Sequence, residues 1–231
     1  METGDRRWVV PCDYDSDPQR SRTEPSRAYI NAGAPRDVHE PVAARLVAEG
    51  LEPVLDVGCG RGRLAQALPS SVIWIGVDQS PAQLADAPSS VIRGDARRLP
   101  IRDRSVGAVA ALWMLYHLEA PAEAIAEAYR VLRPGGLFVA CTSRRDDSPE
   151  VMPPQPASTF DAEEAPALVA GVFGDVEVES WDEPMFTLAD REAVRDFLIN
   201  QLGDPRLIDC VHTPVTVTKR GCLVWARKKA E

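Results

Sequence analysis

Residues 54–65 read VLDVGCGRGRLA, and this stretch decides the fold of the chain around it. An apolar run ends at Asp56, glycines follow at positions 58, 60 and 62, and the apolar pattern resumes with LAQAL. Glycine is favoured where φ is positive or where a ligand approaches the backbone, and a helix N-terminus attracts anionic groups. The stretch therefore predicts a strand, a tight turn and a helix that together form a nucleotide pocket.

Short apolar runs alternate with helical segments around this stretch. The runs EPVLDV, SVIWIGV, SSVIRG, VGAVAALWM and GLFVACTS are typical of parallel strands buried on both faces. The segments RLAQAL, PAQLADA and AEAIAEAYRVLR lie between them and are helical in pattern. A helix over residues 37–49 precedes them, and its predicted buried face contains Val38, Val42, Leu46 and Val47. This order predicts an α/β fold with a doubly wound, mostly parallel sheet and ligands at the carboxyl ends of the strands.

The pattern changes after Ser143. A proline-rich loop leads to a helix that is predicted to begin at Asp161 and to end near Gly171. The strand DVEVESW and a helix over residues 190–202 come next, and PVTVTKRGCLVWARKK is typical of a strand or hairpin near a sheet edge. We therefore expect a seven-stranded sheet with an antiparallel edge strand and a small cap of helix and loop.

The composition excludes several classes of partner. A formal net charge of −9 gives no overall positive field that would attract nucleic acid or anionic lipid. The five cysteines form no CxxC motif and no cluster with metal-ligand spacing. No signal-peptide pattern is seen, and no apolar run approaches the roughly 18 residues of a membrane helix. The sequence predicts a cytoplasmic monomer or homodimer with reduced thiols and no metal, nucleic-acid or membrane partner.

Acidic residues stand at the ends of the first three predicted strands. Asp56 directly precedes the first glycine, where a carboxylate would repel a dinucleotide pyrophosphate but would suit an ammonium group. Asp78 can accept both hydroxyls of a ribose, and Asp95 can accept a hydrogen bond from the adenine amine. Together they fit S-adenosylmethionine. A nicotinamide-dependent Rossmann oxidoreductase is the alternative.

The sequence resembles the class I S-adenosylmethionine-dependent methyltransferases, in particular the small-molecule, type 11-like branch. DVGCGRG is similar to the first motif of that family, GVDQS to its ribose-binding strand end, and GDARRLP to its adenine-contacting segment. VGAVAALWMLYHL is similar to the fourth-strand motif, and RVLRPGG to the signature of the branch. The resemblance implies methyl transfer to an O-, N- or C-nucleophile of a small molecule, such as a natural product or a sugar. A module that binds the cofactor without catalysis is a further alternative.

The resemblance also implies which residues contact the cofactor, from its methionine part to its adenine. They are Asp56, Gly58, Cys59, Gly60, Asp78, Gln79, Asp95, Ala96, Trp113 and Met114. Gly62 either contacts the ligand or allows the following helix to pack closely.

His117 follows the fourth strand, where the acceptor should meet the methyl group. Imidazole titrates near neutral pH, so His117 is the candidate catalytic base for a hydroxyl acceptor. The alternative is a histidine that only packs beside the cofactor. Candidate acceptor-binding residues are Tyr29, Tyr116, Arg144 and His212.

Three segments follow from these roles. We expect the arm of residues 1–36 to contribute to the cover of the active site, and residues 37–231 to form the methyltransferase domain. Within that domain, residues 37–143 form the cofactor half and residues 144–215 supply the acceptor and cap segments. The sequence leaves open the acceptor, the use of a base, and whether the arm and the proline-rich loop act as a lid.

Overall fold

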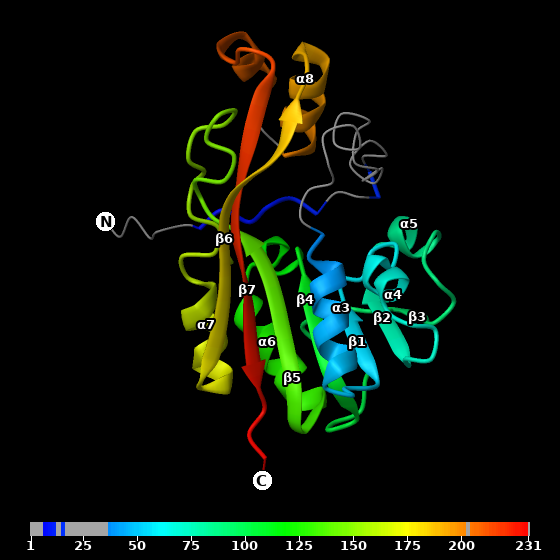
Figure 1. Cartoon of the computed structure of the whole chain (residues 1–231). Helices are drawn as coiled ribbons and strands as arrows, with labels where there is room; N and C mark the ends of the chain where they lie inside the picture. Colours follow the sequence, from blue (N-terminus) through cyan, green and yellow to red (C-terminus); the bar gives the residue numbers. More distant parts are fainter. Residues whose placement is uncertain (1–6, 13–14, 17–36, 202–203, 231) are drawn as a thin grey trace.

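The computed structural model describes residues 7–12, 15–16, 37–201 and 204–230. Across these residues seven strands form one sheet in the order β3-β2-β1-β4-β5-β7-β6 (Figure 1). The strands are β1 (Val54–Val57), β2 (Trp74–Asp78), β3 (Val91–Arg93), β4 (Val106–Leu112), β5 (Leu132–Ser143), β6 (Val176–Leu188) and β7 (Val215–Arg227).

Strands β1 to β5 are parallel, and β7 is antiparallel to both of its neighbours, β5 and β6. The strand order reverses between β1 and β4, which is the place where open α/β sheets bind ligands. The last strand lies near a sheet edge, as expected: β7 is inserted between β5 and β6, and β6 forms the edge on that side of the sheet.

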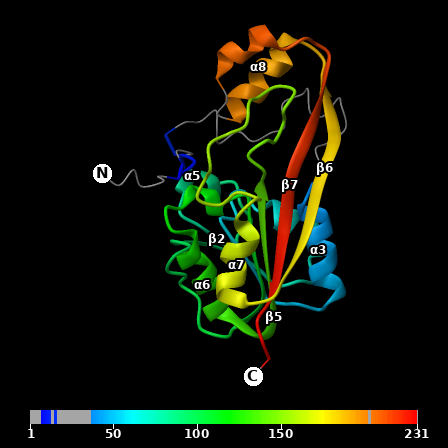
Figure 2. The ribbon, with the colours of Figure 1, turned by 90° about the vertical axis from the view of Figure 1, so that its left-hand side faces the viewer.

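Helices cover both faces of the sheet (Figures 1 and 2). One face carries α3 (His39–Ala48), α4 (Arg63–Ala67) and α5 (Pro81–Leu84), and the other carries α6 (Pro121–Val131) and α7 (Ala165–Phe173). Strands β1 and β4 are therefore buried along their whole length. The predicted doubly wound α/β fold is confirmed.

Three local expectations differ from the structure. Val47 is 42% exposed, because one residue turns a helix by about 100° and the buried face of α3 is already formed by Val38, Val42 and Leu46. Strand β3 is not buried on both faces, since it is a short edge strand. The helix expected at Asp161 begins at Ala165, because the Asp161 carboxylate accepts hydrogen bonds from the Ser158 N–H and the Arg145 side chain.

A cap rises above the carboxyl ends of the strands (Figure 1). Strand β5 ends at Ser143, while β6 and β7 remain paired beyond it as a two-stranded ribbon. Such a ribbon is only marginally stable alone, and here α8 (Arg191–Asn200) and η2 (Pro205–Cys210) pack with it around a separate apolar cluster. The cluster contains Val151, Met152, Phe186, Leu188, Ala193, Val194, Phe197, Leu198, Ile208, Val211 and Val217.

None of the described helices has both the length and the apolar character needed to cross a membrane.

Candidate functional site

The turn after β1 is joined to the end of β2 by backbone hydrogen bonds. The N–H groups of Gly58 and Cys59 donate to the Val77 carbonyl at 2.7 and 3.2 Å. The Gly60 N–H donates to Asp78 Oδ2 at 2.9 Å. Gly58 and Gly60 have φ values of +68° and +51°, which L side chains rarely adopt. Glycine at these positions therefore lets the turn fold back onto the neighbouring strand.

The space around the glycines differs from one to the next. A Cβ atom added at Gly58 would lie 2.7 Å from the Cβ of Met114, so the segment directly after β4 packs on the turn. A Cβ atom at Gly60 would have Gln83 Oε1 as its nearest neighbour, at 3.5 Å. Gly62 has φ of +76°, and a Cβ atom there would lie 2.5 Å from Pro88. Gly62 is therefore better explained by its backbone conformation and by close packing than by contact with a ligand.

Asp78 lies where three strand ends meet. Besides the Gly60 N–H on Oδ2, its Oδ1 accepts the Ser80 N–H at 2.9 Å. The Asp78 carbonyl accepts the Gly94 N–H after β3, also at 2.9 Å. An ionised carboxylate offers about four acceptor positions, so the fixed carboxylate retains capacity for two hydroxyl donors.

Asp56 is buried beneath the glycine turn. Its Oδ2 accepts a hydrogen bond from the Trp74 indole N–H at 3.3 Å. Burial raises the pKa of Asp56 to about 7, against the effect of the Trp74 hydrogen bond and with a smaller contribution from the charge of Asp78. Asp56 can therefore change charge near neutral pH. Burial also raises the pKa of the Cys59 thiol well above its usual range, so this thiol stays neutral.

Asp56 should make the folded protein less stable as pH rises. Between the unfolded value of 3.8 and the folded value of about 7, the folded state keeps a proton that the unfolded state has lost. The free energy of unfolding should then fall by up to about 1.4 kcal/mol per pH unit across this window. In Asp56→Asn this contribution should be absent. Urea unfolding at several pH values measures both proteins, and parallel curves would contradict the assignment.

Trp113 follows β4 in an unusual backbone conformation. Its φ is +59°, and its N–H donates to the Cys141 carbonyl at 3.2 Å. The Trp113 ring meets the buried ring of Trp181, on β6, edge to face, with 6.3 Å between centroids. Left-handed conformations of bulky residues are strained and concentrate at functional sites. The geometry is consistent with a functional position at the end of β4.

Tyr116 and His117 lie in η1 (Leu115–His117), directly after this position. Their rings are 4.6 Å apart between centroids, and both side chains are half-buried. The Nδ1 atom of His117 lies 2.8 Å from the carbonyl oxygen of Val10. The structure thus brings both candidates to the same edge of the sheet as the glycine turn and Asp78.

The turn after β3 contains Asp95, the acidic residue proposed for the adenine. The Asp95 carboxylate accepts hydrogen bonds from the Arg97 guanidinium Nη2 at 2.8 Å and from the Arg97 backbone N–H at 2.9 Å. These hydrogen bonds lower the pKa of Asp95. Ala96 is buried, and Gln79, after β2, is exposed. The adenine and ribose contacts assigned to these three residues stay predictions.

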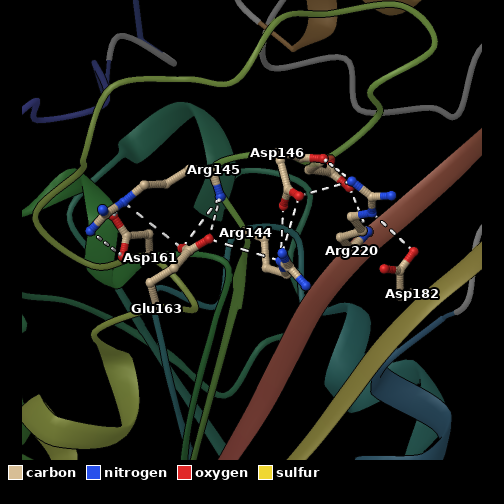
Figure 3. Close-up of polar contacts among 8 residues, drawn as sticks. Arg144, Arg145, Asp146, Asp161, Glu163, Asp182 and Arg220 are labelled. Atoms are coloured by element: carbon tan, nitrogen blue, oxygen red, sulfur yellow. Dashed lines mark hydrogen bonds and ion pairs between the residues drawn. The ribbon is translucent and has the colours of Figure 1, made fainter.

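Arg144 belongs to a network of charges after β5 (Figure 3). Its Nε lies 2.9 Å from Asp146 and 3.9 Å from Glu163, while Arg145 donates to Asp161 at 2.7 Å. Arg144 also lines a hollow of about 370 Å³ beside β6, together with Glu163, Ser180 and Asp182. Because acids of the same chain neutralise Arg144, it offers little net charge to an anionic acceptor. Its acceptor-binding role stays a prediction.

Of the other two acceptor candidates, the structure describes only His212. His212 is exposed in the cap, after η2. Tyr29 lies outside the described residues. No group of three or more His, Cys, Asp or Glu side chains suited to a metal ion is found in the ranges that the structure describes.

Residues near the N-terminus were missed from sequence. Val10 contacts His117, Cys12 contacts Gln79, and Asp15 contacts Ser80. Because the arm is mostly polar, its sequence shows no helical or strand periodicity from which these contacts could be predicted. The short apolar run of residues 8–10 is the signal that could have found the contact.

Comparison with known proteins agrees with this geometry. Residues 55–140 match the family model described as "Methyltransferase domain". A probable S-adenosylmethionine-dependent methyltransferase of Mycolicibacterium smegmatis is 35% identical over 131 residues, which cover 54% of this chain and 50% of that protein. The demethylmenaquinone methyltransferase of Lactiplantibacillus plantarum is 30% identical over 139 residues, which cover 54% and 59%. The chain thus spans little more than half the length of these relatives.

The fold is also shared with solved structures. The [4+2]-cyclase SpnF aligns over 84% of this chain and 80% of its own, with a TM-score of 0.58 and 22% identity. At this identity the comparison shows the fold alone. Because SpnF is named as a cyclase, the fold does not by itself decide the reaction.

Proposed function

We propose that the chain is a class I S-adenosylmethionine-dependent methyltransferase that transfers a methyl group to a small-molecule acceptor. Two comparisons support this: residues 55–140 match a methyltransferase-domain family model, and a relative named as a probable S-adenosylmethionine-dependent methyltransferase is 35% identical over 131 residues. The observation that carries the proposal is the position of Asp78. Its carboxylate is fixed by the Gly60 and Ser80 N–H groups at the meeting point of three strand ends. Two fixed carboxylate oxygens that can accept hydrogen bonds at this place suit the two hydroxyls of a ribose.

The remaining contacts follow from the order of the strand ends. In the proposal, Gly58, Cys59 and Gly60 lie along the methionine part of the cofactor, and Asp56 faces its ammonium group. Gln79 supports the ribose, Asp95 and Ala96 lie beside the adenine, and Trp113 and Met114 lie near the sulfonium. Burial raises the pKa of Asp56, and an ammonium group beside it would lower that pKa again by stabilising the carboxylate form.

The chain's own residues would align the reactants and exclude water. S-adenosylmethionine, when bound, supplies a methyl group on a positively charged sulfur. Trp113, Met114 and Tyr116 would hold the acceptor nucleophile in line with that methyl group. For a hydroxyl acceptor, His117 would take the proton as the oxygen–carbon bond forms.

Two observations support a small acceptor. The net charge of −9 disfavours a nucleic-acid substrate, and the name of the L. plantarum relative specifies demethylmenaquinone. Residues 144–215, which include the cap, would form the acceptor side, with Tyr116, Arg144 and His212 as candidate contacts and Tyr29 from the arm.

The proposal is tested in two successive steps, first by calorimetry and then by product detection. Titrations with S-adenosylmethionine, S-adenosylhomocysteine and NAD first establish the nucleotide. A panel of phenols, amines and sugars is then screened for formation of S-adenosylhomocysteine. Tight NAD binding without a response to either sulfur nucleotide would support the oxidoreductase alternative. Cofactor binding without turnover on any acceptor would support a binding module.

Asp78→Ala should weaken cofactor binding. Two hydrogen bonds to a charged group would be lost, so the dissociation constant should rise about 10- to 150-fold, or roughly 1.5–3 kcal/mol. Asp209→Ala is the matched control, because Asp209 is an exposed acid of the cap that pairs with Arg191. An unchanged dissociation constant in a folded Asp78 variant would remove Asp78 from the site.

A further inference from the structure

Two described pieces of the N-terminal arm, residues 7–12 and 15–16, lie across the carboxyl ends of the strands, and we refer to them as the strap (Figure 1). At its beginning, Trp8 pairs with the loop after β5. The Trp8 N–H donates to the Ala157 carbonyl at 2.9 Å, and the Trp8 carbonyl accepts the Thr159 N–H at 3.1 Å. The strap is therefore attached on the acceptor side of the sheet.

The middle of the strap meets the candidate base. The Val10 N–H donates to the Tyr116 carbonyl at 3.1 Å, and the Val10 carbonyl lies 2.8 Å from His117 Nδ1. Both contacts use backbone atoms of Val10. They place one peptide of the strap directly against η1.

The far end of the strap is attached to the turn after β2. Oδ1 of Asp15 accepts the Ser80 hydroxyl at 2.6 Å and the Ala82 N–H at 3.1 Å. The Gln79 side chain donates to the Cys12 sulfur at 3.4 Å. Ser80 also donates its N–H to Asp78, so the strap is anchored on the same turn as the proposed ribose carboxylate.

The contact with Val10 determines where His117 carries its proton. A carbonyl oxygen only accepts hydrogen bonds, and a neutral imidazole has one N–H group. Nδ1 must then carry the hydrogen, and Nε2 keeps the lone pair. A general base needs that lone pair available on the nitrogen that receives the proton.

We propose that the strap positions the base: the Val10 carbonyl holds His117 in the Nδ1–H tautomer, and Asp15 anchors the strap so that this contact persists. Val10 and Asp15 are thus positioning residues; of these three residues, only His117 would touch the acceptor. This inference rests on the proposed function, in which His117 is the base.

Nitrogen-15 spectra of the imidazole rings test the contact without any substrate. The chain has three histidines, and His117→Gln identifies the signals of His117. We expect a protonated Nδ1 and an unprotonated Nε2 in the parent protein. In Val10→Pro, which loses the bond to Tyr116, and in Asp15→Ala, the signals should shift toward the Nε2–H form. Asp15→Asn keeps an acceptor oxygen and should resemble the parent.

Two controls accompany these spectra. His39 has its Nδ1 2.6 Å from Asp37, far from the strap in sequence, so its signals should not change. Asp204→Ala removes an exposed acid that also accepts a neighbouring backbone N–H, but in the cap, and it should leave His117 unchanged. A parent protein with the proton on Nε2, or a tautomer unaffected in both strap variants, would overturn the inference.

Turnover at saturating cofactor separates positioning from a general structural role. Loss of one hydrogen bond changes the ratio of the two tautomers about tenfold. Because kcat follows the fraction of the Nδ1–H form, Asp15→Ala should lower kcat by about two- to tenfold. In a His117→Gln background the same change should have no further effect, because the strap acts through His117. An equal loss in both backgrounds would contradict the inference. Absence of S-adenosylhomocysteine binding would instead refute the proposed function, and the spectra would still report on the strap.

Discussion

His117→Gln is expected to lower turnover by roughly 10²–10⁴ on a hydroxyl acceptor while cofactor affinity stays nearly unchanged. Glutamine retains a polar side chain of similar reach but cannot take a proton near neutral pH. The half-buried position of His117 directly after β4 places it beside Trp113 and Met114, where the methyl group is proposed to lie. Loss of the base should therefore lower kcat and leave the cofactor dissociation constant unchanged.

The measurement requires the acceptor found in the panel screen. Steady-state rates at saturating cofactor are compared for the parent, His117→Gln and the control His39→Gln, which changes a histidine of α3 that pairs with Asp37. The rate of the parent should rise with pH on the acid side, and the variant should lose this dependence. Normal turnover of His117→Gln would eliminate the base and leave alignment as the mechanism. If cofactor affinity and stability fell together, His117 would instead be a packing residue.

Lys219→Met is expected to destabilise the fold by roughly 3–5 kcal/mol, because it breaks a buried ion pair at the base of the cap. The side chains of Lys219 and Asp147 are only 14% and 7% exposed. Lys219 Nζ donates to Asp147 and, at 3.2 Å, to the Ser148 hydroxyl, and Asp147 also accepts the Arg220 N–H at 2.7 Å. Methionine would leave the Asp147 charge buried without its lysine partner.

Urea unfolding measures this difference against an exposed pair. Arg206→Met breaks the contact with Asp204, where the arginine side chain is 90% exposed, and should leave the free energy of unfolding nearly unchanged. Adding Asp147→Asn to Lys219→Met should recover part of the loss, since the uncompensated charge is then gone. Equal small effects of Lys219→Met and Arg206→Met would show that the buried pair contributes little.

The expectations that hold in the structure depend on local patterns. Apolar runs and glycine positions give strands, turns and helices, and parallel strands bring their carboxyl ends to one edge. For this reason the sequence could place Asp56 and Asp78 at one edge of the sheet, with Met114 at the end of the fourth strand beside the glycine turn. The precise start of α7 could not, because the Asp161 side chain is used by residues that approach from other loops.

The sequence by itself determined the class of fold, the glycine turn and the strand ends that carry the proposed cofactor contacts, because each depends on neighbours within a few residues. The tertiary structure alone decided that β7 lies inside the sheet, that Lys219 is buried against Asp147, and that Val10 reaches His117. The last two contacts join segments 72 and 107 positions apart in the chain, and no local periodicity of the sequence reveals any of the three. They depend on how packing on both faces of the sheet brings distant segments side by side.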